Sequence, residues 1–194
     1  MIFSRGGTMS KLIPRTTKLL ECLAARRTII YRAVSLYYKR LVREEVTLAN
    51  INSMDNILCI GGGPCPFSGI LLHEYTGAHV TIIDNDNSCV NISKKLIEKL
   101  GYSDYITILH SDGNDISPKD YSVIHMAVQI NPMEKVFTHL KQGCSLGAKI
   151  LVRLPKKTLA NLYSINDREV FEDSSKKAYH SWRNVDSTAL FVIS

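Results

Sequence analysis

At 194 residues, the chain has the length of one domain with a short appendage. Its composition of 45% hydrophobic and 22% charged residues is typical of a globular protein, and no apolar stretch approaches the roughly 20 residues that a membrane-spanning helix needs. The five cysteines form no CxxC pair and the six histidines no HxxH spacing, which argues against a disulfide framework and against a metal site. We therefore expect a cytoplasmic protein without a membrane partner.

The net charge of +6 is concentrated at the N-terminus. Residues 1–45 hold ten Lys and Arg and three Glu, whereas residues 46–194 carry a net charge of −1. A basic segment of this kind could contact nucleic acid or an anionic surface. It has no interleaved set of aromatic residues for stacking on bases, so we interpret it as a solvated helical face and expect no nucleic-acid partner.

Apolar residues recur at helical spacing over residues 15–50, as one helix or as two with a break near Arg27 and Thr28. The pattern then changes, and we assign residues 1–55 to a helical N-terminal segment and 56–194 to a second domain. Strands are predicted at 57–60, 80–83, 106–109, 121–128 and 148–154, and helices at 68–75, 88–100, 133–141 and near 157–164. Two last strands, at 176–182 and 189–193, are predicted to flank a polar turn at 183–187.

This order of elements predicts the fold class. Strands that alternate with helices favour a parallel sheet with helices on both faces, that is, a Rossmann-like, doubly wound α/β domain. A late hairpin after five strand–helix units is how class I methyltransferases complete a seven-stranded, mostly parallel sheet. We expect that sheet here, preceded by the short helical segment.

One glycine-rich turn joins the first predicted strand to the next helix. The turn consists of Gly61, Gly62, Gly63 and Pro64. Such a turn lets a ligand approach the backbone closely, and the helix N-terminus adds N–H donors and partial positive charge. It suits either a pyrophosphate or the carboxylate of a methionine moiety. The dinucleotide pattern GxGxxG would need glycine at position 66, where this chain has Pro66, so an NAD site is the less favoured interpretation.

Two acidic residues follow the next two predicted strands. Asp84 ends the second strand, 21 residues after Gly63, where a carboxylate can accept hydrogen bonds from both ribose hydroxyls. Asp112 follows the third, where many S-adenosylmethionine enzymes place an acid against the adenine amino group. Turn and acids together predict S-adenosylmethionine as the cofactor; the alternative is a structural turn with solvated acids. The expected cofactor contacts are Gly61, Gly62, Gly63, Pro64, Asp84, Asn85, Asp112, Gly113 and Ala127.

The segment IGGGPCPFSGILL, residues 60–72, resembles the G-[SG]-G-P-L-P-L-[TS]-x-I-x-L motif of nicotianamine synthases. The resemblance extends over residues 57–153 and includes the strand ends at 84–86, 112 and 126–128, the segment 133–135 and Arg153. It implies an enzyme that transfers the aminocarboxypropyl arm of S-adenosylmethionine to a small amine or amino acid, in metallophore biosynthesis, and releases 5′-methylthioadenosine. Cys65 departs from the motif, which has leucine there.

The resemblance also implies catalytic residues. The family carries a glutamate base on the helix before the first strand, in a pattern close to Y-x-x-L-x-x-x-E, which Tyr38, Leu41 and Glu45 fit. Glu45 is therefore the expected base, with Tyr38 beside it, and Tyr75 aligns with a tyrosine that could orient the amine. Alternatively, Glu44 and Glu45 pair with Arg or Lys three or four residues away, and Tyr75 only packs.

Three functional interpretations remain open from the sequence. The first is aminocarboxypropyl transfer, and the second is methyl transfer to a small molecule on a nearly identical core. The third is a cofactor-binding module without catalysis that holds a partner through its basic N-terminal helices. Because only about 55 residues precede the first strand, we expect much of the family's acceptor-binding lid to be absent or supplied by a second copy in a homodimer.

Overall fold

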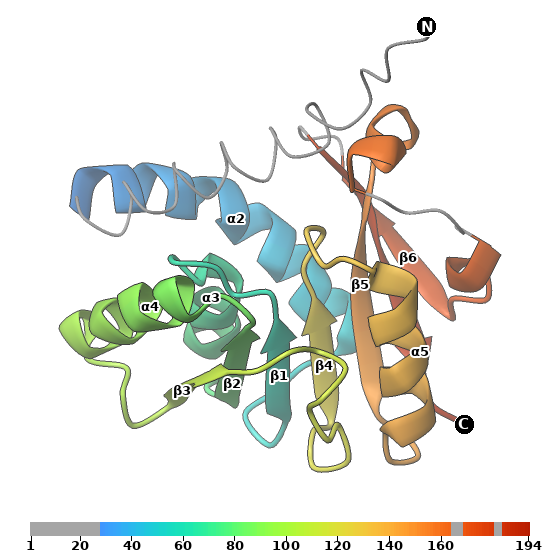
Figure 1. Cartoon of the computed structure of the whole chain (residues 1–194), viewed down its shortest axis with the longest axis horizontal. Coiled ribbons are helices and arrows are strands. Elements are labelled where there is room, and N and C mark those ends of the chain that lie inside the picture. The colour runs from blue at the N-terminus through green and yellow to red at the C-terminus, as the bar shows by residue number, and fades with distance from the viewer. Residues whose placement is uncertain (1–27, 164–168, 181–183) are drawn as a thin grey trace, which may run out of the picture.

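A computed structural model describes residues 28–163, 169–180 and 184–194 (Figure 1). The helices are α2 (Thr28–Ala49), α3 (Phe67–Thr76), α4 (Asn87–Leu100) and α5 (Met133–Gly143), with the short 3-10 helices η1 (Lys157–Tyr163) and η2 (Glu169–Phe171). The strands are β1 (Asn56–Ile60), β2 (His79–Asp84), β3 (Ile106–His110), β4 (Val123–Met126), β5 (Lys149–Pro155), β6 (Lys176–Tyr179) and β7 (Val185–Val192).

The seven strands form one sheet in the order β3-β2-β1-β4-β5-β7-β6. The first five are parallel, and β7 runs antiparallel between β5 and β6. This is the predicted Rossmann-like sheet with its C-terminal hairpin, so the expected fold class is confirmed. The direction of the strand order reverses at β1, because β2 and β3 lie on one side of it and β4 and β5 on the other. Open α/β sheets bind ligands at such a switch point.

Helices cover both faces of the sheet, as Figure 1 shows. Successive residues of a strand point to opposite faces, and β1 divides in this way. Ile57 and Cys59 pack with α2, α3 and α4, whereas Leu58 and Ile60 pack with α5. Because both faces are covered, the central strands β1 and β4 are mostly apolar, and all four residues of β4 are buried.

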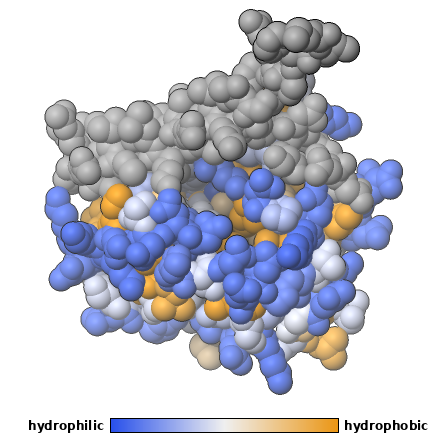
Figure 2. Space-filling model, viewed as in Figure 1, coloured by the Kyte–Doolittle hydropathy of each residue, from blue (hydrophilic) through white to orange (hydrophobic). Residues whose placement is uncertain are grey.

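The helix ends follow from local sequence signals. Asp86 caps α4 by accepting hydrogen bonds from the amides of Ser88 and Cys89. Gly101, with φ of 76°, ends α4 in the left-handed conformation, as its position in the sequence predicted. The coloured residues of the face seen in Figure 2 are mostly hydrophilic, with apolar residues in scattered patches. Among the described residues, no helix is long and apolar enough to cross a membrane.

The C-terminal hairpin differs from the sequence prediction. β7 begins at Val185, so residues 185–187 belong to a strand and not to the turn predicted at 183–187. Asp186 and Ser187 favour turns in isolation, but here Ser187 pairs with both β5 and β6 and is buried. β4 is also shorter than predicted, and the helix expected near 157–164 is the 3-10 helix η1. The predicted helix over 15–27 and residues 181–183 lie outside the described residues.

Candidate S-adenosylmethionine site

A pocket of about 410 Å³ lies at the carboxyl ends of the parallel strands. Its size falls within the range of roughly 300 to 1,000 Å³ that is usual for small-molecule sites. The structure brings all nine expected cofactor contacts to its wall, although they come from four separate segments of the chain. They are Gly61, Gly62, Gly63, Pro64, Asp84, Asn85, Asp112, Gly113 and Ala127.

The glycine turn after β1 is held against β2. The amides of Gly61 and Gly62 both donate to the carbonyl oxygen of Ile83, at 3.0 and 3.1 Å. A Cβ atom added at Gly62 would lie 2.4 Å from Cγ2 of Ile82, so only glycine fits this close approach. Gly63 has φ of 64°, in the left-handed region that favours glycine. These glycines therefore shape the pocket floor by sterics as well as by conformation.

Asp84 of the pocket wall connects the glycine turn after β1 to the segment that follows β2. Its Oδ2 accepts a hydrogen bond from the Gly63 amide at 2.7 Å, and its Oδ1 accepts one from the Asp86 amide at 2.9 Å. Each carboxylate oxygen has a second lone pair, so both can still accept a hydrogen bond from a ligand. The backbone amides of Gly63 and Asp86 thus hold the Asp84 carboxylate in place.

Asp112 lies farther along the same edge of the sheet, after β3. Its Oδ1 accepts hydrogen bonds from the backbone amide and the side-chain amide of Asn114, at 2.8 and 2.7 Å. These bonds, the backbone one first, hold the pKa of Asp112 below its usual range. Asp112 is therefore an ionised acceptor at neutral pH.

A buried ion pair joins α2 to β5 beside the pocket. Nε and Nη2 of Arg153 donate to the two carboxylate oxygens of Glu45, at 2.7 and 2.8 Å. Arg153 is 3% exposed and Glu45 is fully buried. The third arm of the guanidinium, Nη1, donates to Oγ of Ser68 in the first turn of α3 at 2.8 Å. Burial alone would raise the pKa of Glu45, but the Arg153 guanidinium outweighs burial and holds that pKa well below its usual range.

His125 of β4 lies next to this ion pair and also lines the pocket. Its Nε2 is 3.4 Å from a carboxylate oxygen of Glu45 and has no hydrogen-bond partner among the described residues. Burial, followed by the nearby Arg153 charge, lowers the pKa of His125, so the imidazole is neutral at pH 7. Cys59, on the same sheet face, has its pKa raised to about 12 by burial and is no thiolate nucleophile at that pH.

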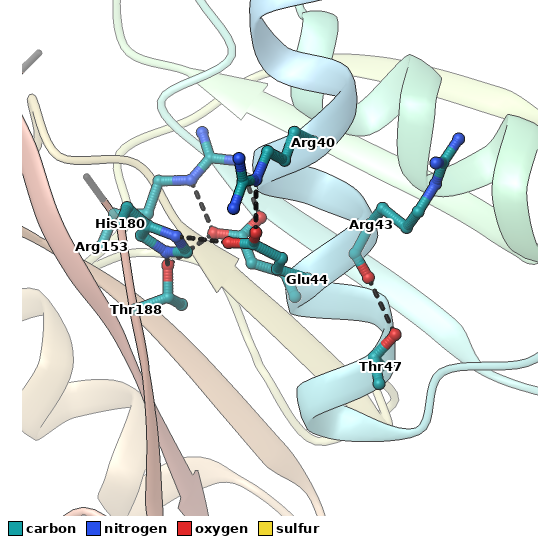
Figure 3. Close-up of polar contacts among 8 residues, drawn as sticks. Arg40, Arg43, Glu44, Thr47, Arg153, His180 and Thr188 are labelled. Carbon is teal, nitrogen blue, oxygen red and sulfur yellow. Dashed lines mark hydrogen bonds and ion pairs between the residues drawn. The ribbon is translucent and has the colours of Figure 1, made fainter. Parts of the chain in front are cut away.

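Polar contacts continue from the ion pair to the C-terminal hairpin (Figure 3). The Thr188 hydroxyl of β7 donates to Glu45 at 2.8 Å and lies 2.9 Å from Nε2 of His180. Nδ1 of His180 is 2.8 Å from Glu44, which also accepts from Arg40 at 2.8 Å. The alternative that Glu44 pairs with an arginine of its own helix is therefore confirmed, whereas Glu45 pairs with a residue 108 positions away.

The structure separates the three expected catalytic residues. Tyr38 lines the pocket, stacked on Phe67 with ring centroids 5.4 Å apart. Glu45 does not line the pocket, because its carboxylate is enclosed by its buried partners. Tyr75 does not line it either; its hydroxyl donates to the carbonyl of Lys39 at 3.4 Å, and its ring packs under Arg43 of α2. Of the three residues expected to be catalytic, Tyr38 alone is among those that line the pocket, and the catalytic roles of all three stay predictions.

Ser68 and His125 are among the polar residues of the pocket wall to which sequence reasoning assigned no role. The position of Ser68 in the glycine-rich motif could have indicated a site residue. No sequence feature indicated His125, because it lies inside an apolar strand and reaches the pocket only through the pairing of that strand with β1. Among the described residues, no group of three or more His, Cys, Asp or Glu is arranged to hold a metal ion.

Comparison with known proteins places this geometry in a family. The sequence model described as "Nicotianamine synthase protein" matches residues 35–185. A search of curated proteins found no match. Among solved structures, MtNAS in complex with MTA and tNA has a TM-score of 0.82 at 22% identity, covering 95% of this chain and 74% of that chain.

Two further structures have similar folds. A glutamate-to-glutamine mutant of MtNAS in complex with S-adenosylmethionine has a TM-score of 0.82 at 22% identity, covering 96% of this chain and 77% of that one. An RNA methyltransferase from Salinibacter ruber in complex with S-adenosyl-L-homocysteine has a TM-score of 0.64 at 16% identity, covering 79% and 90%. These likenesses show the fold. Because the family match covers most of the sequence, this chain belongs to the nicotianamine synthase family of S-adenosylmethionine-dependent transferases.

Proposed function

We propose that this chain transfers the aminocarboxypropyl arm of S-adenosylmethionine to an amine. The observation that carries the proposal is the turn after β1, tied by its Gly63 amide to Asp84, within a chain of the nicotianamine synthase family. A rigid turn beside an acidic strand end suits a nucleoside whose ribose hydroxyls donate to the carboxylate. The fit is supported by the lone pairs that Asp84 retains toward the pocket.

The acidic residues would fix the adenosine part. Asp84 would accept from the ribose hydroxyls, and Asp112, held ionised by Asn114, would accept from the adenine amino group. Asn85, Gly113 and Ala127 line the same wall and would complete the adenosine contacts. Both acids are fixed by backbone hydrogen bonds, so little rearrangement would accompany binding.

S-Adenosylmethionine supplies a sulfonium leaving group. In arm transfer, the amine nitrogen forms a bond to the terminal methylene of the arm, the carbon–sulfur bond breaks, and its electron pair goes to sulfur, giving neutral 5′-methylthioadenosine. The nitrogen then loses a proton to solvent or to a base. Tyr38 lines the pocket, and we propose that its hydroxyl orients the acceptor amine.

We propose for Glu45 a role other than that of the base, which the family resemblance implies. A carboxylate that is fully buried and bonded at both oxygens to Arg153 is poorly placed to take a proton from an amine. Its lowered pKa also makes it a weak base. We propose that Glu45 positions Arg153 and His125, and that Tyr75 joins α3 to α2.

Methyl transfer is the second candidate, and the shared fold with methyltransferases supports it. The two reactions differ in the acceptor position relative to the sulfonium and in the nucleoside that is released. The chain would be incubated with S-adenosylmethionine and a panel of amines and amino acids, and the nucleoside identified by mass. We expect 5′-methylthioadenosine above the uncatalysed background. S-Adenosylhomocysteine would instead establish methyl transfer, and cofactor binding without either product across a broad panel would favour the binding module.

The acceptor and the setting are part of the same proposal. A small amine or amino acid would be the acceptor, the product would be a metallophore, and the reaction would take place in the cytoplasm. We keep the division into a helical segment, residues 1–55, and a cofactor-binding domain, residues 56–194, and a second copy in a homodimer would supply the missing part of the acceptor lid. Sedimentation of the purified chain would report the oligomeric state.

A further inference from the structure

The order of strands gives a bound nucleoside a direction across the pocket. The acids expected to hold the adenosine follow β2 and β3, on one side of β1. On the other side of β1 lie β4 and then β5, which contribute His125 and Arg153 to the pocket wall. A ligand with its ribose at Asp84 therefore extends its remaining part over the glycine turn toward Arg153. In S-adenosylmethionine, that part is the arm, which ends in a carboxylate and an amine.

Arg153 has binding capacity left on this side. A guanidinium carries five N–H donors. Three are used, two by Glu45 and one by Ser68, so within the described residues one N–H on each terminal nitrogen has no acceptor. A donor that is buried and unpaired is costly, and an incoming acceptor removes that cost. Because Glu45 clamps the guanidinium on its far side, the free donors are held in a fixed orientation.

The neighbouring groups also favour an anion here. Ser68 accepts from Arg153 and keeps its own hydroxyl hydrogen available to a ligand. It lies in the first turn of α3, a ten-residue helix whose N-cap, Pro66, provides no side-chain cap. Independently, the Nε2 atom of His125 is buried, lines the same end of the pocket and has no partner among the described residues. The arm end of the pocket thus holds several polar groups that lack a counterpart.

We infer that Arg153 and Ser68 form the anchor for the α-carboxylate of the aminocarboxypropyl arm, with Glu45 as the positioning residue that aims Arg153. This inference rests on the proposed function and specifies which residues recognise the transferred group. A carboxylate fits because it accepts two parallel N–H bonds from a guanidinium. Because Glu45 balances the charge of Arg153, the anchor would bind the carboxylate through directed hydrogen bonds more than through net charge.

The test compares ligands that differ at the carboxylate. Binding of S-adenosylmethionine, decarboxylated S-adenosylmethionine and 5′-methylthioadenosine would be measured by calorimetry. We expect the wild type to prefer the first ligand over the second by about 10- to 100-fold, as for a charged hydrogen-bonded pair. Ser68→Ala should reduce this ratio about fivefold or more, by weakening only the carboxylate-bearing ligand. Arg153→Lys, which keeps a cation for Glu45 but loses the fork, should reduce it further.

The matched control is Ser111→Ala, a serine on the adenosine side of the same pocket. It should leave the ratio unchanged, whatever it does to each affinity. Equal wild-type affinities for the two arm-bearing ligands, or an unchanged ratio in Ser68→Ala, would overturn the anchor. The proposed site is judged separately: 5′-methylthioadenosine should bind and should lose affinity in Asp84→Asn. Failure of every ligand to bind the wild type would refute the site and the anchor together.

Discussion

Removing one partner of the ion pair between Glu45 and Arg153 should strongly destabilise this fold. Glu45→Gln keeps the size and shape of the side chain but removes its charge, leaving the Arg153 guanidinium buried at 3% exposure without a counterion. Breaking a buried pair from one side costs about 3 to 5 kcal/mol. For a chain of this length, such a loss lowers the melting temperature by roughly 6 to 20 °C. Urea unfolding followed by circular dichroism would measure the change in the free energy of unfolding.

Two variants make this measurement decisive. Glu44→Gln changes the adjacent glutamate of the same helix, which is about one-third exposed and pairs with the exposed Arg40. Its loss should be about 1 kcal/mol or less for an exposed pair, together with whatever the His180 contact contributes. The double variant Glu45→Leu/Arg153→Met removes both charges and should be more stable than Glu45→Gln. A loss of less than about 1 kcal/mol in Glu45→Gln, equal to that of Glu44→Gln, would refute the argument.

Three other predictions concern Gly62, Asp84 and His125. Gly62→Ala forces a Cβ against Ile82, so it should destabilise the fold by about 1 to 3 kcal/mol and weaken S-adenosylmethionine binding. An unchanged melting temperature would contradict the close packing at Gly62. Asp84→Asn should weaken that binding about 10-fold or more with little loss of secondary structure, as titration calorimetry and circular dichroism would report. The lowered pKa of His125 means that the folded chain binds fewer protons than the unfolded chain below about pH 6.5, so the free energy of unfolding should fall from pH 7 to pH 5. His125→Gln should make the free energy of unfolding depend less on pH. If the pH profile of the variant runs parallel to that of the wild type, His125 is not the cause of the fall.

The sequence was informative where the structure depends on short-range patterns. The apolar run 57–60, the glycines after it and the stop at Gly101 each reflect the conformation of a few neighbouring residues. Asp84 was also predictable, because parallel strands end at one edge and bring their following residues together. The residues that line this end of the pocket could therefore be predicted from the sequence, and their contacts with a cofactor stay predictions.

The acceptor side could not be derived in the same way. Glu45 looked like one of two consecutive carboxylates on a basic helix, and nothing near it in the sequence indicates a partner in β5. Its burial depends on how α2 crosses the sheet, which is decided by the packing of the whole face. Ser187 was likewise predicted to lie in a turn, because it belongs to a polar stretch. Its pairing with β5 and β6 cannot be recognised from the neighbouring residues. Tertiary context decided both cases.

The shared use of Arg153 has a consequence for how this protein can change. The same guanidinium joins α2 to the sheet and lines the pocket, so a substitution of Arg153 selected for a new substrate also changes how the helix is held. Substitution at position 45 or 153 alone passes through a chain with an unpaired buried charge. Divergence at this end of the pocket should therefore proceed by paired replacements, and homologues that differ at one of these positions should differ at the other. The proposed adenosine end, where backbone amides hold Asp84, is free of that constraint.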